Sequence, residues 1–240
     1  MFQYAATKGI AESNKLDYQI PKHDHLLFDC FEMHSSLDKT NPSQGLLTYN
    51  EPHFHFDENL FSSCPDDRDL FGYFQTEKYF KNIKDEIKKD FTFKSYITES
   101  VLDISNIINS SKVFSIHFRR TDYSHQQDAH PFPSEKYYID SINKFSDYDF
   151  GIVFSDDIEW CMQQSILNSD RIIFSRNNNY TDLYLMSQCQ GHIMANSSFS
   201  WWGAWLSSSE QKTVTVPDVW FGPKLNNDIK DLIPEDWNVI

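Results

Sequence analysis

The feature that most constrains the fold of this chain is an apolar run that ends abruptly in charged residues. Residues 113–118 read V-F-S-I-H-F and are followed by Arg119, Arg120 and, after one threonine, Asp122. Short continuous apolar runs are typical of buried parallel strands, and open α/β sheets bind ligands just outside the carboxyl ends of such strands. The pattern therefore predicts a buried strand that delivers two arginines to a binding crevice.

The two arginines allow two interpretations. A guanidinium is always charged and its planar fork matches two oxygens of a phosphate at once, so Arg119 and Arg120 are candidate phosphate ligands. An ion-paired turn, in which Asp122 holds the arginines, explains the same residues. The segment alone does not decide between them.

Composition limits the partners. The chain has 21 Lys+Arg against 35 Asp+Glu, a net charge of −14, which argues against nucleic acid or an anionic membrane surface as a partner. An anionic ligand must then be met by a local cationic pocket. No window approaches the ~20 apolar residues of a membrane span. The cysteines lack metal-ligand or redox spacing and are typical of reduced thiols in a cytoplasmic protein: Cys30, Cys64, Cys161 and Cys189.

The second half of the chain alternates between strand and helix patterns. We expect further strands at 148–154, 171–174, 192–195 and 214–216, and helices at 135–142, 158–167, 181–189 and 199–206. Such an alternation predicts a parallel, doubly wound sheet. The first half is less regular, with helical spacing at 1–10, 83–91 and 93–109, and we expect a domain boundary at 110–112.

Three of the predicted strand ends meet at one sheet edge if the connections are right-handed. Besides the arginines, this edge gathers the carboxylates Asp156 and Asp157 and the serines Ser197 and Ser198, which precede a helix. A helix N-terminus favours an anion, although capping alone also explains the serines. Two arginines and a helix end match a diphosphate, and a carboxylate pair matches ribose or guanine N–H groups. The combined site is that of a sugar nucleotide.

Four segments carry a family resemblance. In chain order they are G-Y-F-Q-T-E-K-Y-F, H-F-R-R-T-D, F-S-D-D-I-E-W and M-A-N-S-S-F-S-W-W-G-A-W-L. They resemble the bacterial α-1,2-fucosyltransferases of glycosyltransferase family eleven. The similarity covers nearly the whole chain, from M-F-Q-Y-A to V-P-D-V-W-F.

The resemblance implies a fold and an activity. The fold is α/β and GT-B-like, with two facing Rossmann-like domains: an acceptor-side domain at 1–110, a GDP-fucose-binding domain at 111–225 and a C-terminal tail at 226–240. The N-terminal domain is expected to be incomplete, because family members carry a strand and a G-G-L-G-N-Q-like turn before M-F-Q-Y-A. The activity is inverting transfer of L-fucose from GDP-fucose to the 2-hydroxyl of a galactoside, in surface glycan or O-antigen synthesis. The expected location is cytoplasmic, with peripheral association at the inner face of the membrane.

The resemblance also implies roles for individual residues. Arg120 is the predicted catalytic arginine, which would hold the diphosphate. The general base is predicted from position in the sequence instead: Asp122 is the nearest carboxylate and Asp128 is the second candidate, while an ion pair with the arginines explains Asp122 equally well. The residues expected to bind the donor are His117, Arg119, Arg120, Asp156, Asp157, Asn196, Ser197, Ser198 and Phe199.

No metal and no cofactor are expected, because arginines and a helix end already meet the diphosphate charge. Asp67-Arg68-Asp69 matches the D-x-D pattern of metal-dependent glycosyltransferases, but it follows a proline-containing polar loop, so we predict a solvated acidic loop. The main alternative function is a catalytically impaired protein that still binds a GDP-sugar. A phosphatase is a weaker alternative, since no nucleophile with a partnered base is evident.

Overall fold

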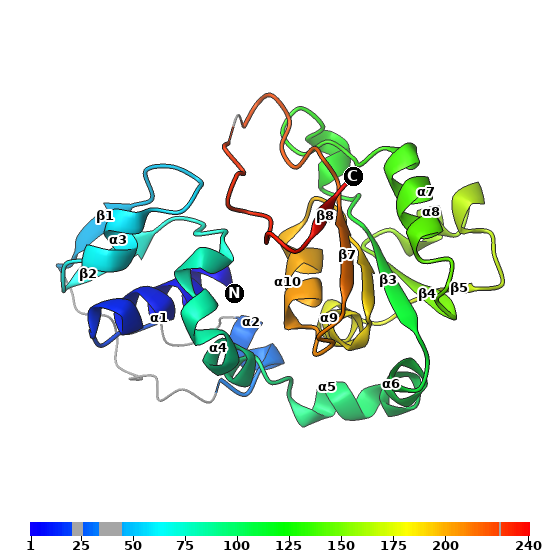
Figure 1. The fold of residues 1–240 in the computed structure, drawn as a ribbon, viewed down its shortest axis with the longest axis horizontal. Coiled ribbons are helices and arrows are strands. Elements are labelled where there is room, and N and C mark those ends of the chain that lie inside the picture. The colour runs from blue at the N-terminus through cyan, green and yellow to red at the C-terminus, as the bar shows by residue number, and fades with distance from the viewer. Residues whose placement is uncertain (21–25, 34–44, 226) are drawn as a thin grey trace. The chain divides into compact units, whose positions relative to one another are not determined.

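The structure is a computed structural model that describes residues 1–20, 26–33, 45–225 and 227–240, and it divides into two compact units (Figure 1). Unit 1 comprises Met1–Lys94 and Asn227–Glu235, and unit 2 comprises Ser95–Asn226 and Asp236–Ile240. The boundary predicted at 110–112 falls later than this division. The reason is that two helices, α5 (Ser95–Ser100) and α6 (Leu102–Asn109), pack against α9 (Asn179–Gln188) of unit 2.

Unit 2 is built on a six-stranded sheet in which every pair of neighbouring strands is parallel. The spatial order is β5-β4-β3-β6-β7-β8. The strands are β3 (Val113–Phe118), β4 (Phe150–Ser155), β5 (Ile172–Phe174), β6 (Gly191–Ile193), β7 (Thr213–Val216) and β8 (Asn238–Val239). The prediction of a parallel, doubly wound sheet is thus confirmed. Strand β8 was not predicted, because two exposed residues leave no apolar run to detect.

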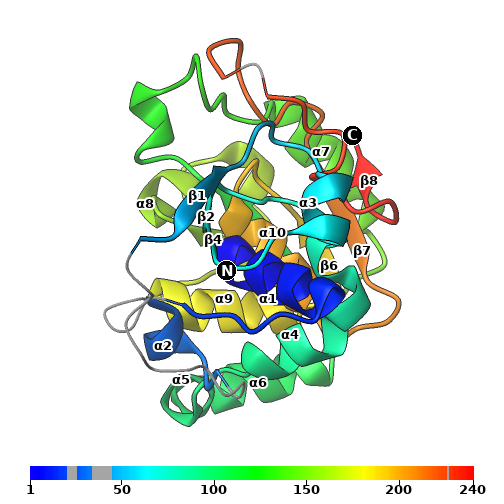
Figure 2. The same cartoon turned by 90° about the vertical axis from the view of Figure 1, so that its left-hand side faces the viewer.

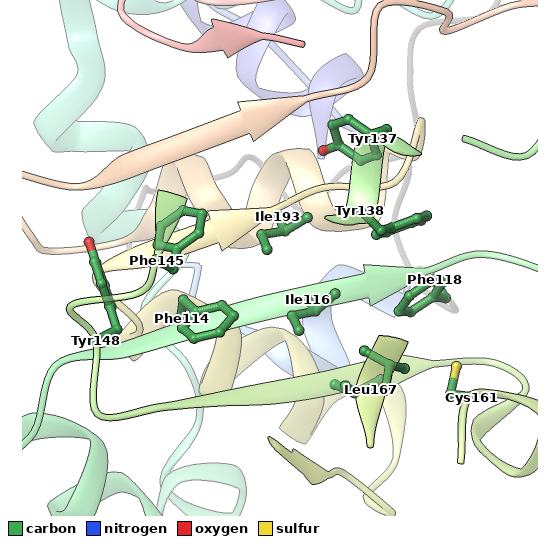
Figure 3. Close-up of a cluster of buried hydrophobic side chains, with 11 residues drawn as sticks. Phe114, Ile116, Phe118, Tyr137, Tyr138, Phe145, Tyr148, Cys161, Leu167 and Ile193 are labelled. Atoms are coloured by element: carbon green, nitrogen blue, oxygen red, sulfur yellow. The ribbon is translucent and has the colours of Figure 1, made fainter. Parts of the chain in front are cut away.

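Both faces of this sheet are covered, as its apolar strands require. Phe114, Ile116 and Phe118 of β3 belong to a core cluster that includes side chains of α7 (Glu135–Lys144) and α8 (Ile158–Cys161) (Figure 3). Other side chains of β3 and β4 join a second cluster with α9. All six residues of β3 are buried. The central strand is therefore fixed along its length up to the point where the arginines begin.

The helix predictions of unit 2 were right in position and less accurate in length. Ser134 caps α7 by accepting the N–H of Tyr137 at 3.1 Å, as predicted. Helix α9 begins earlier than the predicted Thr181, because Asn178 caps it. The helix predicted over 158–167 is wrong beyond Cys161, where α8 ends and a separate 3₁₀ turn, η4 (Ser165–Leu167), follows.

Unit 1 contains helices and a two-stranded parallel sheet (Figure 2). Its elements are α1 (Phe2–Asn14), α2 (Leu26–Cys30), β1 (Leu47–Asn50), α3 (Glu58–Ser63), β2 (Arg68–Phe71), η1 (Glu77–Tyr79), η2 (Lys81–Ile83) and α4 (Lys84–Asp90). The helices predicted at 1–10 and 83–91 are confirmed. The predicted acidic loop is wrong in part, because Arg68 and Asp69 begin β2.

The core of unit 1 is aromatic and contains a buried ion pair. Phe31 packs on Phe91 with ring centroids 4.9 Å apart. Lys8 Nζ lies 2.6 Å from the Asp90 carboxylate, which also accepts the hydroxyl of Tyr4. A cavity of about 700 Å³ beside α1 is lined by residues of unit 1 only. It shares no residue with the sheet edge of unit 2 that carries the arginines.

Two predictions drawn from composition can be compared with the fold. The four cysteines are free, in agreement with the prediction of reduced thiols. Within the described ranges, no helix is both long and apolar enough to cross a membrane.

Candidate functional site

The strand order of unit 2 locates the candidate site. Counted within the unit, the order is 3-2-1-4-5-6, that of a dinucleotide-binding Rossmann sheet. The order reverses between β3 and β6, and ligands of such sheets bind outside the carboxyl ends of the strands at this reversal. The segment 119–134 follows β3, and the segment 194–197 follows β6. The predicted arginines and serines therefore follow the two strands that flank the switch point.

Asp156, at the end of β4, holds the backbone that leaves β3. Its carboxylate accepts the N–H of Arg120 at 2.8 Å and the N–H and hydroxyl of Thr121 at 3.1 and 2.5 Å. Arg119 Nη1 lies 3.3 Å from the same carboxylate, whose side chain is 18% exposed. Both oxygens of Asp156 are thus engaged by the segment that carries the arginines.

Arg119 and Asp122 form a two-point ion pair. Arg119 Nε lies 2.8 Å from Asp122 Oδ1, and Nη2 donates to Oδ2 at 3.0 Å. Burial opposes ionisation of Asp122, but the hydrogen bond and charge of Arg119 outweigh it and lower the pKa of that carboxyl. The ion-paired turn considered from the sequence is present. A lowered pKa also makes Asp122 a weaker base, and its catalytic role remains a prediction.

Arg120 lies in a different environment from Arg119. Its Cζ is 3.6 Å from the ring centroid of Trp160 and 4.4 Å from that of Phe132. Arg120 also forms a long ion pair with Asp157, in which Nε lies 3.9 Å from Oδ2. Within the described residues Nε is buried and has no hydrogen-bond partner, while the whole side chain is 21% exposed. The guanidinium thus lies over two aromatic rings, and its distance to a carboxylate is longer than its distance to the nearer ring.

His117 is buried on the opposite side of β3 from Phe118. Its ring centroid lies 5.4 Å from that of Phe199, and the pair connects β3 with α10 (Ser198–Leu206). Burial lowers the pKa of His117 to about 3, so the imidazole is neutral at physiological pH. Nδ1 has no hydrogen-bond partner in the part of the chain that the structure describes. A buried neutral ring with an unsatisfied nitrogen is suited to a ligand contact.

Asn196, Ser197 and Ser198, which follow β6, each have a different structural role. The Asn196 side-chain N–H groups donate to the backbone carbonyls of Pro131 and Trp220, both at 2.9 Å, and the Asn196 backbone carbonyl accepts the hydroxyl of Tyr123 at 3.0 Å. Ser197 caps α10 by accepting the N–H of Phe199 at 3.3 Å. Asn196 and Ser197 are buried, whereas Ser198 is exposed. Asn196 therefore ties the loop after β3 to the end of β6, and Ser198 is available to a ligand.

The loop between β3 and α7 is also fixed by the chain that follows β7. Gly222 donates its N–H to the carbonyl of Ala129 at 2.9 Å, and Lys224 donates to the carbonyl of Asp128 at 3.0 Å. A Cβ atom at Gly222 would lie only 2.4 Å from the Asp128 oxygen, so glycine is required for this approach. The loop is held at several points.

Three residues of this sheet edge were missed by sequence reasoning. Trp160 and Phe132 contact the Arg120 guanidinium with their rings. Asp182 is a buried carboxyl on α9 that accepts a hydrogen bond from the Ser175 hydroxyl, just after β5. Burial raises the pKa of Asp182 to about 7. Trp160 lies in the F-S-D-D-I-E-W segment and was detectable there. Asp182 carried no signal, since an acid in the first turn of a helix is common.

The prediction that no metal is needed remains a prediction. In the described portion of the chain, no group of three or more histidines, cysteines and carboxylates is placed to hold a metal ion. Asp67 and Asp69 of the D-x-D segment belong to unit 1, and both are exposed.

Sequence comparison assigns the family. The model of the family described as glycosyl transferase family 11 matches residues 49–240. An alpha-1,2-colitosyltransferase of Escherichia coli is 32% identical over 276 residues, covering 99% of this chain and 93% of that protein. The O-antigen biosynthesis glycosyltransferase WbnK of Escherichia coli is 32% identical over 186 residues, covering 70% of this chain and 59% of WbnK.

Comparison with solved structures supports the fold. POFUT1 in complex with GDP superposes with a TM-score of 0.56 at 11% identity, covering 89% of this chain and 93% of that one. The fucosyltransferase NodZ from Bradyrhizobium superposes with a TM-score of 0.56 at 12% identity, covering 84% and 86%. The predicted α/β, GT-B-like fold class is thereby confirmed.

Proposed function

Because the chain belongs to glycosyl transferase family 11 and is a glycosyltransferase, we propose that it transfers L-fucose from GDP-fucose to the 2-hydroxyl of a galactoside. The WbnK relative supports a place in O-antigen or other surface glycan synthesis. The single observation that carries the proposal is the switch point of unit 2. There the stacked guanidinium of Arg120 and the N-terminus of α10 follow neighbouring strands.

The donor diphosphate is the ligand that this edge suits best. A guanidinium edge binds two phosphate oxygens, and the first N–H groups of a helix attract an anion. Arg119 is largely engaged by Asp122 and Asp156, so we assign the main diphosphate contact to Arg120, with Arg119 and Ser198 assisting. His117 and Phe199 would lie beside the nucleotide.

Recognition of ribose or guanine is assigned to Asp157 in preference to Asp156. The sequence left both open, and Asp156 already binds the β3 loop through both oxygens. Asp157 caps α8 with Oδ1, which accepts the N–H of Trp160 at 3.2 Å, and its side chain is 40% exposed. Its second oxygen can accept a hydrogen bond from a ribose hydroxyl or a guanine N–H group of GDP-fucose.

The proposed reaction is an in-line displacement. The acceptor oxygen forms a bond to the anomeric carbon, the bond from that carbon to the phosphate oxygen breaks, and GDP leaves with the electron pair. Arg120 stabilises the charge that develops on GDP. The acceptor proton passes to a base that contributes about 10²- to 10⁴-fold. Asp122 remains our candidate, although its pair with Arg119 weakens it, and Asp128 is the second.

Acceptor binding is assigned to unit 1 as part of the same proposal. The family resemblance implies that the donor binds unit 2, and we therefore propose unit 1 for the galactoside. Transfer of fucose from labelled GDP-fucose to simple β-galactosides, followed by linkage analysis of the product, tests both donor and linkage. A product linked at another hydroxyl would contradict the assignment to the 2-position.

A second donor deserves a direct test because one relative is named an alpha-1,2-colitosyltransferase. Colitose is fucose without its 3-hydroxyl. A site that hydrogen-bonds a substrate hydroxyl rejects the analogue lacking it by roughly 10⁴-fold or more, whereas an apolar pocket discriminates weakly. The ratio of kcat/KM for GDP-fucose and GDP-colitose therefore identifies the natural donor.

The non-catalytic alternative is separated by two measurements on the same protein. Calorimetric titration with GDP reports the nucleotide site, and a fucose-transfer assay reports turnover. Binding without turnover would favour a GDP-sugar-binding protein. We expect both, and we expect transfer to be about unchanged in EDTA, because arginine and helix-end charges replace a metal. Complete loss of transfer in EDTA, restored by a divalent cation, would contradict the metal-independent mechanism.

A further inference from the structure

Two aromatic rings lie against the guanidinium of Arg120, and the family assignment gives them no role. We propose that Trp160 and Phe132 are positioning residues, whose rings hold the Arg120 guanidinium and aim its N–H edge at the donor diphosphate. The inference rests on the proposed function, since it requires a phosphate ligand for Arg120. Its basis is the pair of distances from Cζ to the ring centroids, 3.6 Å for Trp160 and 4.4 Å for Phe132.

Aromatic faces and carboxylates hold a guanidinium in different ways. A carboxylate binds the N–H edge and competes with a phosphate for the same donors. An aromatic ring attracts the cation over its face and leaves the N–H groups in the plane unpaired. Arg119 illustrates the first arrangement and Arg120 the second. A stacked arginine is therefore ordered before the ligand arrives and keeps its donors for the ligand.

Each aromatic wall is itself fixed. Asp157 caps the short helix that carries Trp160, and the Trp160 ring packs on Phe118 with centroids 5.8 Å apart. The N–H of Phe132 is held by the Gln127 side chain at 3.2 Å, and the preceding residue, Pro131, accepts the Asn196 amide. The backbone N–H of Arg120 is bound by Asp156. Arg120 is thus located by its backbone and by two aromatic rings that are themselves held in place.

The position of Trp160 differs from that of the other tryptophans. Trp201, Trp202, Trp205, Trp220 and Trp237 are all buried in the core. Trp160 is only partly buried and lies on a four-residue helix at the ligand-binding edge of the sheet. Trp160 therefore differs from the other five in its partial exposure at this edge, where its ring contacts the Arg120 guanidinium.

The test is a double-mutant cycle between Trp160 and Arg120. Trp160→Leu should lower kcat/KM for GDP-fucose by about 2- to 30-fold, the range expected for a cation–π contact, with part of the loss in kcat. In an Arg120→Ala background the same substitution should change kcat/KM by less than about twofold, because its partner is absent. Trp160→Phe keeps an aromatic face and should restore most of the loss. Phe132→Leu should act in the same direction with a smaller effect, since its ring is farther from Cζ.

A spectroscopic readout accompanies the kinetics. Subtracting the fluorescence of Trp160→Phe from that of the wild type isolates the Trp160 indole, whose emission should change when GDP binds beside Arg120. The same subtraction with Trp237→Phe, a core tryptophan that packs on Trp201, should show no GDP-dependent change. Thermal unfolding of each variant separates loss of packing from loss of positioning.

The outcomes separate the two levels of the proposal. Equal losses from Trp160→Leu in the wild-type and Arg120→Ala backgrounds would overturn the positioning role while leaving GDP-fucose transfer intact. Failure of the wild-type protein to bind GDP would overturn the proposed function and this inference with it. Coupling between the two residues, together with rescue by phenylalanine, would establish that Trp160 positions Arg120.

Discussion

The two arginines that follow β3 are neighbours in sequence and lie in opposite chemical environments. Arg119 is on a carboxylate side, where Asp122 and Asp156 occupy its N–H groups. Arg120 lies over the aromatic rings of Trp160 and Phe132. One short motif can therefore supply both an ion pair that stabilises the turn, through Arg119, and a ligand contact, through Arg120. Internal ion pairs hold the turn together, while stacking leaves a charged edge for an incoming anion.

The largest expected effect is at Arg120. Removal of one preorganised donor to developing charge typically costs about 2.7 to 4 kcal/mol of barrier, so Arg120→Ala should lower kcat roughly a hundredfold or more. Arg119→Ala is the matched variant and should cost about tenfold or less in kcat, because its guanidinium is already engaged by carboxylates. Steady-state kinetics with saturating acceptor measures both.

The ranking of these two variants decides which arginine makes the main diphosphate contact. If Arg119→Ala proved the more damaging for turnover while both proteins remained folded, the main diphosphate contact would move to Arg119. The aromatic pair around Arg120 would then be structural. Near-normal transfer by both variants would remove the switch-point site altogether.

The next effect concerns the carboxylate that supports both arginines. Asp156→Ala removes the acceptor of two backbone N–H groups and one hydroxyl, and hydrogen bonds to a charged group contribute about 1.5 to 3 kcal/mol. We expect the free energy of unfolding to fall by about that amount and transfer to fall as the loop loosens. Urea denaturation measures the first. Asp103→Ala, an exposed acid on α6, is the control and should change neither.

The apolar strands, the alternation with helices and the clustering of polar residues at strand ends were all readable from the sequence. They were readable because buried parallel strands and amphipathic helices leave continuous or periodic apolar patterns. What could not be read was the pairing of side chains across strands. Nothing in R-R-T-D indicates that Asp156 would bind the Arg120 and Thr121 N–H groups, or that Trp160 would reach Arg120.

Unit 1 shows the other limit of sequence reasoning. Its short strands β1 and β2 are partly exposed and lack a clear apolar run, so Arg68 and Asp69 looked like loop. The end of α8 was missed for a related reason, since 158–167 contains apolar residues at spacings that suit a helix or a turn. Local pattern fixed the elements where burial was complete and failed where it was partial.

Asp182 extends the comparison to a carboxyl without an arginine partner. No salt bridge reaches it within the described residues, and burial raises its pKa from 3.8 to about 7. The folded state therefore holds this proton more tightly than the unfolded chain, so its contribution to stability is complete below pH 3.8 and is lost as pH rises through about 7. Between pH 6 and 8 the wild type should lose about 1.4 kcal/mol relative to Asp182→Asn. Urea denaturation at several pH values measures this difference, and parallel profiles would show that Asp182 ionises normally.

The smallest expected effects concern the adjacent serines after β6, of which one stabilises the fold and the other is proposed to contact the ligand. Ser197 is buried and caps α10, so Ser197→Ala should lower the free energy of unfolding by about 1 kcal/mol. Ser198 is exposed at the first turn of the same helix, so Ser198→Ala should leave stability nearly unchanged and weaken GDP binding several-fold through loss of a hydroxyl contact. Thermal unfolding and calorimetric titration with GDP measure the two consequences separately. If Ser198→Ala bound GDP as tightly as the wild type, the phosphate would be held at this end of the site by backbone N–H groups of α10 alone.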